Sequence, residues 1–259
     1  MSEQSSKQQG EPQLETPASA LPPGYEGLAE ARRLLRTIRA GALATLAPEG
    51  FPFASLVNVA TDIDGAPLIL TSALSSHTRH MLVDPRVSLL LSEGGKGDPL
   101  AHPRLTLVGR MAQISGSPRA LVKARFLARH PKSALYADFG DFSFWRMEIV
   151  RAHLNGGFAK AATYDGAAIV LDAQESAALA SCESQTLERL NADLDGLRAM
   201  AIKLCGAADA RWRASGLDPE GLDLLAGDSS ARVVFAQRAG DSQSLERALE
   251  ALDFVASAK

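Results

Sequence analysis

Cysteine is scarce in this sequence, since Cys182 and Cys205 are the only two among 259 residues. Two cysteines imply neither a disulfide framework nor a cysteine-based metal site, and they allow at most a single disulfide, as in an exported protein. Basic residues are not in excess either: 27 Lys and Arg stand against 30 Asp and Glu, a formal net charge of −3. This balance argues against a nucleic-acid binder with a broad basic surface, but it permits a local basic pocket for a small anion.

Long apolar runs are also missing. Residues 1–24 are rich in Ser, Gln, Glu and Pro and contain no apolar stretch after a basic start, so they predict a disordered tail and not a secretory signal. No later segment has the unbroken apolar length of a membrane span. We therefore expect a cytoplasmic protein that has no membrane or nucleic-acid partner.

Several catalytic motifs are absent too. No Gly-x-Gly-x-x-Gly follows a strand, which excludes the dinucleotide-binding fingerprint, and no Gly-x-Ser-x-Gly nucleophile elbow occurs. His102, His130 and His153 are scattered, with no i, i+4 pairing and no carboxylate at a useful spacing. No metal site is expected from them.

What is present, in the stretch from residue 25 to 165, is a series of short strands with few helices. Alternating apolar patterns and turn residues predict a series of strands with turn-length links. The predicted helices are 25–39, 76–83 and 118–130, and the predicted strands are 42–46, 51–60, 67–72, 86–92, 104–114, 142–150 and 152–158. Because helices do not alternate regularly with strands, the pattern favours a small antiparallel barrel over a doubly wound sheet.

The composition changes near residue 164. A helical region rich in Ala, Leu and Glu (174–205) precedes three short strands (211–215, 221–225 and 232–236) and a last helix (242–257). The predicted fold class is therefore α+β, with an antiparallel barrel in residues 25–165 and a smaller αβββα domain in residues 166–259.

Two polar segments at strand ends point to an anion. The segment 67–79 (PLILTSALSSHTR) runs from an apolar strand into hydroxyls and a cation, and the segment 103–109 (PRLTLVG) opens a second strand. Arginines, hydroxyls and a helix start suit a phosphate monoester. The candidate residues are Thr71, Ser72, Thr78, Arg79, Arg104 and Thr106. The alternative is structural, with Ser75 and Ser76 capping a helix and Arg79 solvated.

Two further features have the same double interpretation. His77 could donate to a phosphate or lie near a redox cofactor, whereas a single histidine is more often structural or merely exposed. Gly156 and Gly157 permit close approach of a planar ligand, or simply form a turn.

The order of motifs resembles a known family. The run ATLAPEGFPFASLVNVATDIDGAPLILTSALSSHTRH, followed by DPRVSLLL and PRLTLVG, is similar to the FMN-binding split barrel of pyridoxamine 5′-phosphate oxidase relatives. The later pieces HPKSALYADFGDFSFWRMEI and HLNGGFAKA resemble, more narrowly, the HugZ-type haem-utilisation branch. The αβββα tail resembles the domain commonly appended there.

The resemblance implies a homodimer with FMN near the subunit interface. The residues matching the phosphate end are Ser55, Thr71, Ser72, Thr78 and Arg79, those on the second strand are Arg104 and Thr106, and those near the ring system are Gly157 and Phe158.

The sequence also departs from this family. His80 stands where Asn often follows the Thr-Arg pair, and Arg189 and Leu194 stand where the appended domain often has two histidines. Imidazole is a common haem-iron ligand, so their loss argues against haem ligation from that helix.

The leading expectation is a flavin-dependent oxidoreductase in which FMN supplies the redox chemistry for an unidentified small-molecule substrate. Haem binding or haem breakdown is the second hypothesis. A non-enzymatic flavin-binding or interaction module is the third, and vitamin B6 oxidation ranks below a generic flavin role.

Overall fold

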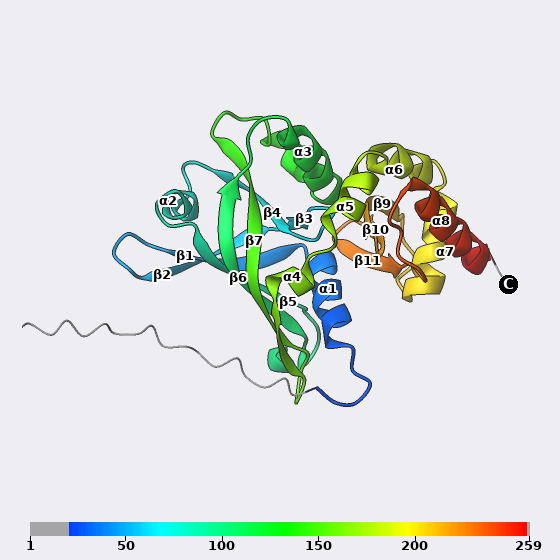
Figure 1. The fold of residues 1–259 in the computed structure, drawn as a ribbon, viewed down its shortest axis with the longest axis horizontal. Coiled ribbons are helices and arrows are strands. Elements are labelled where there is room, and N and C mark those ends of the chain that lie inside the picture. The colour runs from blue at the N-terminus through cyan, green and yellow to red at the C-terminus, as the bar shows by residue number, and fades with distance from the viewer. Residues whose placement is uncertain (1–20, 258–259) are drawn as a thin grey trace, which may run out of the picture.

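The computed structural model describes residues 21–257, so residues 1–20 of the predicted disordered tail lie outside the described residues. Figure 1 shows a curled sheet with helices around it, beside a second and smaller sheet covered by helices α5 to α8. The elements in chain order are α1 (Gly27–Thr37), β1 (Ala40–Leu46), β2 (Pro52–Asn58), β3 (Ala60–Thr61), β4 (Pro67–Ser72), α2 (Ser76–Val83), β5 (Arg86–Ser92), the short 3-10 helix η1 (Pro99–Ala101), β6 (Arg104–Gln113), α3 (Pro118–Arg129), the 3-10 helix η2 (Pro131–Leu135), β7 (Phe142–Asn155), β8 (Ala161–Asp165), α4 (Gly166–Ile169), α5 (Ala173–Ala180), α6 (Glu183–Asn191), α7 (Leu194–Cys205), β9 (Arg213–Asp218), β10 (Gly221–Ala226), β11 (Ser229–Val234) and α8 (Ser242–Ser257).

The first sheet is wholly antiparallel. Its strands follow the order β2-β1-β5-β6-β7-β4-β3, and β8 pairs with the far end of β7. The hairpin between β1 and β2 closes at Gly50, whose positive φ of 87° suits a residue without a Cβ. The predicted α+β fold class is confirmed, because an antiparallel split barrel is followed by a second, smaller sheet of three strands that has helices before and after it.

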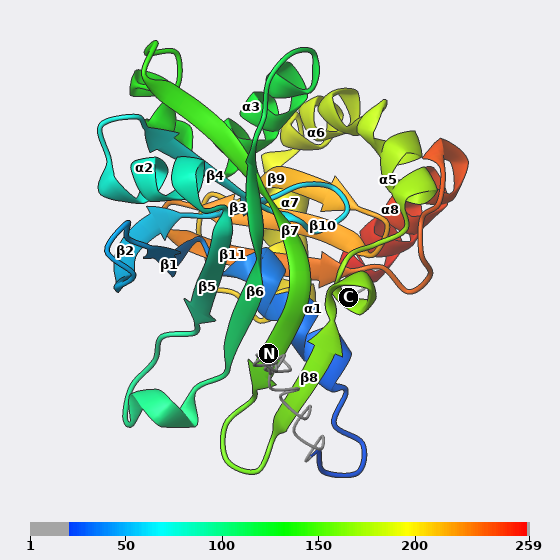
Figure 2. The same cartoon turned by 60° about the vertical axis from the view of Figure 1, so that its left-hand side comes forward.

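The two faces of this sheet differ. Inward side chains such as Leu43, Leu89 and Leu107 are fully buried and pack with Leu34 and Leu35 of α1. Figure 2 shows strands β5 to β8 in front and α1 behind them. The outward side chains, here called the outer face, are Ala54 and Leu56 (β2), Ala42 and Ala44 (β1), Ser88 and Leu90 (β5), Arg104, Thr106 and Val108 (β6), Arg151, His153 and Asn155 (β7), and Thr163 (β8).

Strand β7 corrects one prediction. The sequence suggests two strands, 142–150 and 152–158, because the apolar alternation changes phase between them. The structure has one strand, Phe142–Asn155, in which Val108 pairs with Arg151 and Gly109 with Ile149, so that Val150 is an extra, bulged residue. A β-bulge shifts the alternation by one residue without ending the strand. A Cβ on Gly109 would lie 2.0 Å from the Glu148 carbonyl oxygen, so this close approach needs glycine.

The second sheet has the strand order β11-β10-β9 and forms its own core with α7 and α8. The predicted helical region 174–205 is three helices. Asp172 caps α5 and Asp193 caps α7 through hydrogen bonds from backbone N–H groups, and Gly206 ends α7 in the left-handed conformation with φ of 62°.

A buried charge cluster joins the two parts of the chain. Arg36 of α1 lies 3.3 Å from the Asp218 carboxylate, and Arg232 pairs with Asp218 at 2.8 Å and Asp223 at 2.7 Å. Arg125 of α3 pairs with Glu183 and donates to the Leu217 carbonyl at 2.9 Å. We call Arg36, Arg125 and Arg232 the junction arginines, and each has its charge balanced in the interior.

No helix in the range 21–257 is long and apolar enough to cross a bilayer.

Candidate functional site

Six of the ten predicted site residues lie together where α2 packs against β2 and β4. We call this group the α2 corner, and it comprises Ser55, Thr71, Ser72, His77, Thr78 and Arg79. Ser55 Oγ lies 3.1 Å from His77 Nδ1, and Thr78 donates its hydroxyl to Thr71 Oγ1 at 2.9 Å. The sequence clustered these residues correctly along β4 and α2, and the β2 residue joins them through the sheet.

The donors in the α2 corner are unequally available to an anion. Thr71 and Thr78 are only 3% exposed, and Ser72 gives its hydroxyl to the Asp141 carboxylate at 2.5 Å. Arg79 is exposed and reaches Ser76 Oγ at 3.4 Å, with no carboxylate paired to it among the described residues. Arg79 is therefore the donor that this corner offers most freely.

A second imidazole lies beside the corner. His80 Nδ1 is 3.0 Å from Thr45 Oγ1, and its ring meets Phe53 edge-on at 5.2 Å. Burial, and as the second cause the nearby His80, lowers the pKa of His77 below its ordinary value. This shift favours the neutral form of the His77 imidazole.

The other predicted residues lie at the far end of β7. Arg104 pairs in register with Asn155, and Thr106 pairs with His153, which in turn pairs with Thr163 of β8. A hollow of about 320 Å³ lies over them. Its lining residues are Arg104, Thr106, His153, Leu154, Asn155, Ala161, Ala162 and Thr163, and none of these is acidic.

The turn after β7 borders this hollow. Gly157 has a φ of 101°, and its N–H donates to the Asn155 side chain at 3.2 Å. A Cβ on Gly157 would lie 2.9 Å from the Ala101 carbonyl oxygen, so the turn needs glycine for both reasons. Phe158 is fully exposed at the tip.

One chain does not bring the two groups into a single site. Ser72 pairs with Phe142 at the start of β7, whereas Arg104 pairs with Asn155 at its end. At roughly 3.3 Å per residue, the strand between these positions is about 40 Å long. The two groups also lie on opposite faces of the sheet, because Ser55 projects inward beneath α2 whereas Arg104 belongs to the outer face.

Sequence reasoning missed His153 as a site residue. It treated this histidine as one of several scattered imidazoles. The alternation of polar and apolar residues over 151–155 (RAHLN) was the available signal, because in a strand it places His153 on the same face as Arg151 and Asn155.

His130 and the two altered family positions of the second domain, Arg189 and Leu194, are structural. His130 is 6% exposed, its Nε2 lies 2.8 Å from the Val59 carbonyl oxygen, and burial lowers its pKa to about 4. Arg189 pairs with Glu246 of α8 at 2.7 Å. Leu194 packs against the core of the second domain.

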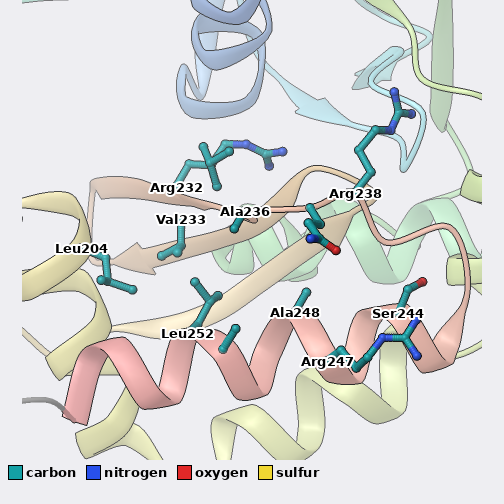
Figure 3. Close-up of a pocket in the computed structure, with 12 residues that line it drawn as sticks. Leu204, Arg232, Val233, Ala236, Arg238, Ser244, Arg247, Ala248 and Leu252 are labelled. Atoms are coloured by element: carbon teal, nitrogen blue, oxygen red, sulfur yellow. The ribbon is translucent and has the colours of Figure 1, made fainter.

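A separate cavity of about 730 Å³ lies in the second domain between β11 and α8. Figure 3 shows Leu204, Val233 and Leu252 along it, with Ser244 and Arg247 at one end. Arg238 also lines this cavity, and its guanidinium pairs with Glu175 at 2.6 Å. None of the ten predicted residues lines this cavity.

Comparison with known proteins identifies relatives over the barrel and beyond it. A family model described as "CREG, beta-barrel" matches residues 22–168. The crystal structure of the Agrobacterium tumefaciens protein Atu2129 is 35% identical with a TM-score of 0.79, over 88% of this chain and 95% of that protein. The heme binding protein from Mycobacterium smegmatis is 30% identical with a TM-score of 0.54, over 90% of this chain and 98% of that protein.

A curated relative covers the barrel alone. The "Non-canonical heme oxygenase HOZ, chloroplastic" of Arabidopsis thaliana is 40% identical over 123 residues, which is 46% of this chain and 37% of the relative. This chain therefore spans little more than a third of that protein's length.

Proposed function

The chain belongs to the CREG β-barrel family, and we propose that it binds haem, as a homodimer, on the outer face of its barrel sheet. The observation that carries the proposal is the similarity, along 90% of the chain, to a heme binding protein of Mycobacterium smegmatis. The name of the Arabidopsis relative supports the same ligand. Membership of the HugZ-type branch is part of this proposal.

The chemistry of the outer face suits haem. A porphyrin is a flat apolar ring that carries two carboxylate groups at one edge. On the outer face, Leu56 is 79% exposed, Leu90 37% and Val108 40%, so an apolar platform lies open beside Arg104. Apolar surface left bare on a folded chain marks a binding surface, and arginine is the side chain best suited to carboxylates.

A homodimer would cover the part of this platform that surrounds the haem. A two-fold interface uses the same patch on both subunits, so a bare sheet face can be its own partner. Val108→Asp places a charge on the patch, and we expect this variant to be monomeric in light-scattering measurements at concentrations where the native chain is dimeric. Leu121→Asp, on exposed α3, is the matched control and should leave the dimer intact. A native chain that is monomeric would contradict the homodimer.

Titration with haem tests the ligand. We expect a saturating Soret band at micromolar haem, with one haem per protomer. A titration that leaves the spectrum of free haem unchanged would overturn the proposal. Loss of the Soret band on adding ascorbate and O₂ would extend it to haem breakdown, whereas a stable band would make the chain a binding module.

FMN is the second candidate, and Arg79 favours it. This guanidinium stands exposed near the start of α2, where no carboxylate pairs with it. If Arg79 holds the phosphate, Arg79→Ala should weaken FMN binding by roughly 1.5–3 kcal/mol, the worth of a charged hydrogen bond. Quenching of flavin fluorescence gives the affinity, and Arg211→Ala is the control. Equal affinities for the two variants would reject this role.

A further inference from the structure

The proposed haem site needs an iron ligand, and the two family histidines of the appended domain are replaced by Arg189 and Leu194. We infer that His153 coordinates the haem iron and that Arg104 and Arg151 hold the acid groups of the ring. This inference rests on the proposed function and assigns residues within that site.

The sheet register places His153 beside the apolar platform. One line of cross-strand partners crosses six strands, in the order Leu56, Ala42, Leu90, Thr106, His153 and Thr163. Side chains stand roughly perpendicular to a sheet. An imidazole that rises from this line leaves the neighbouring Leu90 and Thr106 free to support a flat ring.

The hydrogen bonding of His153 matches that of a metal ligand. Its Nδ1 lies 3.1 Å from Thr163 Oγ1. Ligating histidines commonly use one ring nitrogen for such a contact, which orients the ring and leaves the other nitrogen for the metal. Across residues 21–257, Nε2 of His153 has no hydrogen-bond partner, and His153 lines the same hollow as Arg104 and Thr106.

Two arginines flank this imidazole. Arg151 precedes His153 by two residues on the same face of β7, a spacing of roughly 7 Å. The Arg104 guanidinium donates only to the Leu100 carbonyl, at 3.1 Å. Asp165 lies opposite Arg151 in register, but within residues 21–257 no ion pair joins these two residues. The charges of Arg104 and Arg151 are therefore both available to the carboxylates of a ligand.

The other histidines are less suited to this role. His130 is buried with its Nε2 at the Val59 carbonyl, and His102 uses its Nε2 at the Lys96 carbonyl. His77 and His80 belong to α2 and contact Ser55 and Thr45, on the inner side of the barrel. His153 alone among the described histidines combines a free Nε2 with the open apolar face.

Spectroscopy of the full chain loaded with haem tests the ligand. In His153→Gly, we expect the Soret maximum to shift and the haem affinity to fall at least tenfold, and we expect added imidazole to restore the native spectrum. His102→Gly is the control and should behave as the native chain. Because glycine weakens a strand, His153→Gln is a second variant, which should show the same shift without rescue.

The arginines have a different expected signature. Arg104→Gln and Arg151→Gln should each weaken haem binding about tenfold, as expected for loss of a charged hydrogen bond, and should leave the Soret maximum in place.

The outcomes separate the two proposals. A native spectrum in both His153 variants, or loss of the Soret band in His77→Gly or His80→Gly instead, would overturn the assignment of the ligand while haem binding stands. A native chain that binds no haem overturns the proposed function and the ligand together.

Discussion

Arginine serves two different ends in the two halves of this molecule. At the junction between the domains, Arg36 and Arg232 are buried and each faces the Asp218 carboxylate. On the outer face, Arg104 and Arg151 are half-buried, and no carboxylate pairs with them in the part of the chain that the structure describes. A buried charge is tolerated only when it is paired with an opposite charge. A solvent-accessible charge without a partner is free to form a charged hydrogen bond with a ligand. The pairing therefore separates the structural arginines from those that we propose bind a ligand.

The histidines show the same contrast. His130 is buried and bonded to a backbone carbonyl, and its pKa is low. His153 is half-buried on the outer face and has a hydroxyl at one ring nitrogen only. The first imidazole stabilises the chain in its neutral form, and the second is open to a ligand.

The sharpest way to break the junction is Asp218→Asn. Asp218 is fully buried and faces two guanidiniums, so the change leaves Arg36 without a carboxylate. We expect the free energy of unfolding in urea to fall by about 3–5 kcal/mol, as when one partner of a buried pair is removed. Asp228→Asn is the control, because its carboxylate is 97% exposed, and it should cost less than about 0.5 kcal/mol. Equal stability of the two variants would contradict a structural role for the junction arginines.

The second largest effect is expected from lowering the pH, which should reduce the folding stability through His130. Burial, opposed by the hydrogen bond to Val59, lowers the pKa of His130 to about 4 from the ordinary 6.5. As the pH falls below about 6.5, the unfolded chain takes up this proton before the folded chain does. The contribution is therefore fully present above pH 6.5 and is lost as the pH falls toward 4, by up to about 3 kcal/mol.

Urea unfolding of native chain and His130→Gln at pH 8, 7, 6 and 5 measures this effect. The two stabilities should move in parallel between pH 8 and 7, and the native chain should lose more below that range. An identical pH dependence for both proteins would contradict a contribution of His130 to the loss of stability in acid.

The smallest effect is expected at the exposed pair of Arg189 and Glu246. Their side chains are 56% and 47% exposed, so Arg189→Ala should change the free energy of unfolding by at most about 1 kcal/mol. The Soret band of the haem-loaded chain should not move, because this position no longer carries the family histidine. A stability loss above 2 kcal/mol, or a shifted Soret band, would contradict this interpretation.

Local patterns in the sequence were enough for most elements of the fold. The alternation of apolar residues predicted the strands of the barrel, and the 3.6-residue pattern predicted α1, which is shorter by two residues at each end. The break at residue 150 was misinterpreted as a strand end, since a bulge and a turn shift the alternation in the same way until the partner strand is known.

The candidate site was less accessible to sequence reasoning. Thr71, Ser72, Thr78 and Arg79 are close in the chain and lie close in space. Arg104 was expected beside them, but it pairs with Asn155 at the other end of β7. His153 joined the outer face only once the register with Thr106 and Thr163 was known.

By itself the sequence determined the α+β class, the order of helices and strands and the lack of a cysteine-based site, because these depend on composition and on neighbours along the chain. Only the tertiary structure decided which charged side chains are paired with an opposite charge. Arg36 and Asp218 are far apart in sequence and meet only through the packing of the two domains. Arg104 lies on the outer face between Ser92 and Asn155, and neither of these register partners carries a charge. Burial and pairing arise from long-range contacts, and they distinguish a residue that holds the fold from one that awaits a ligand.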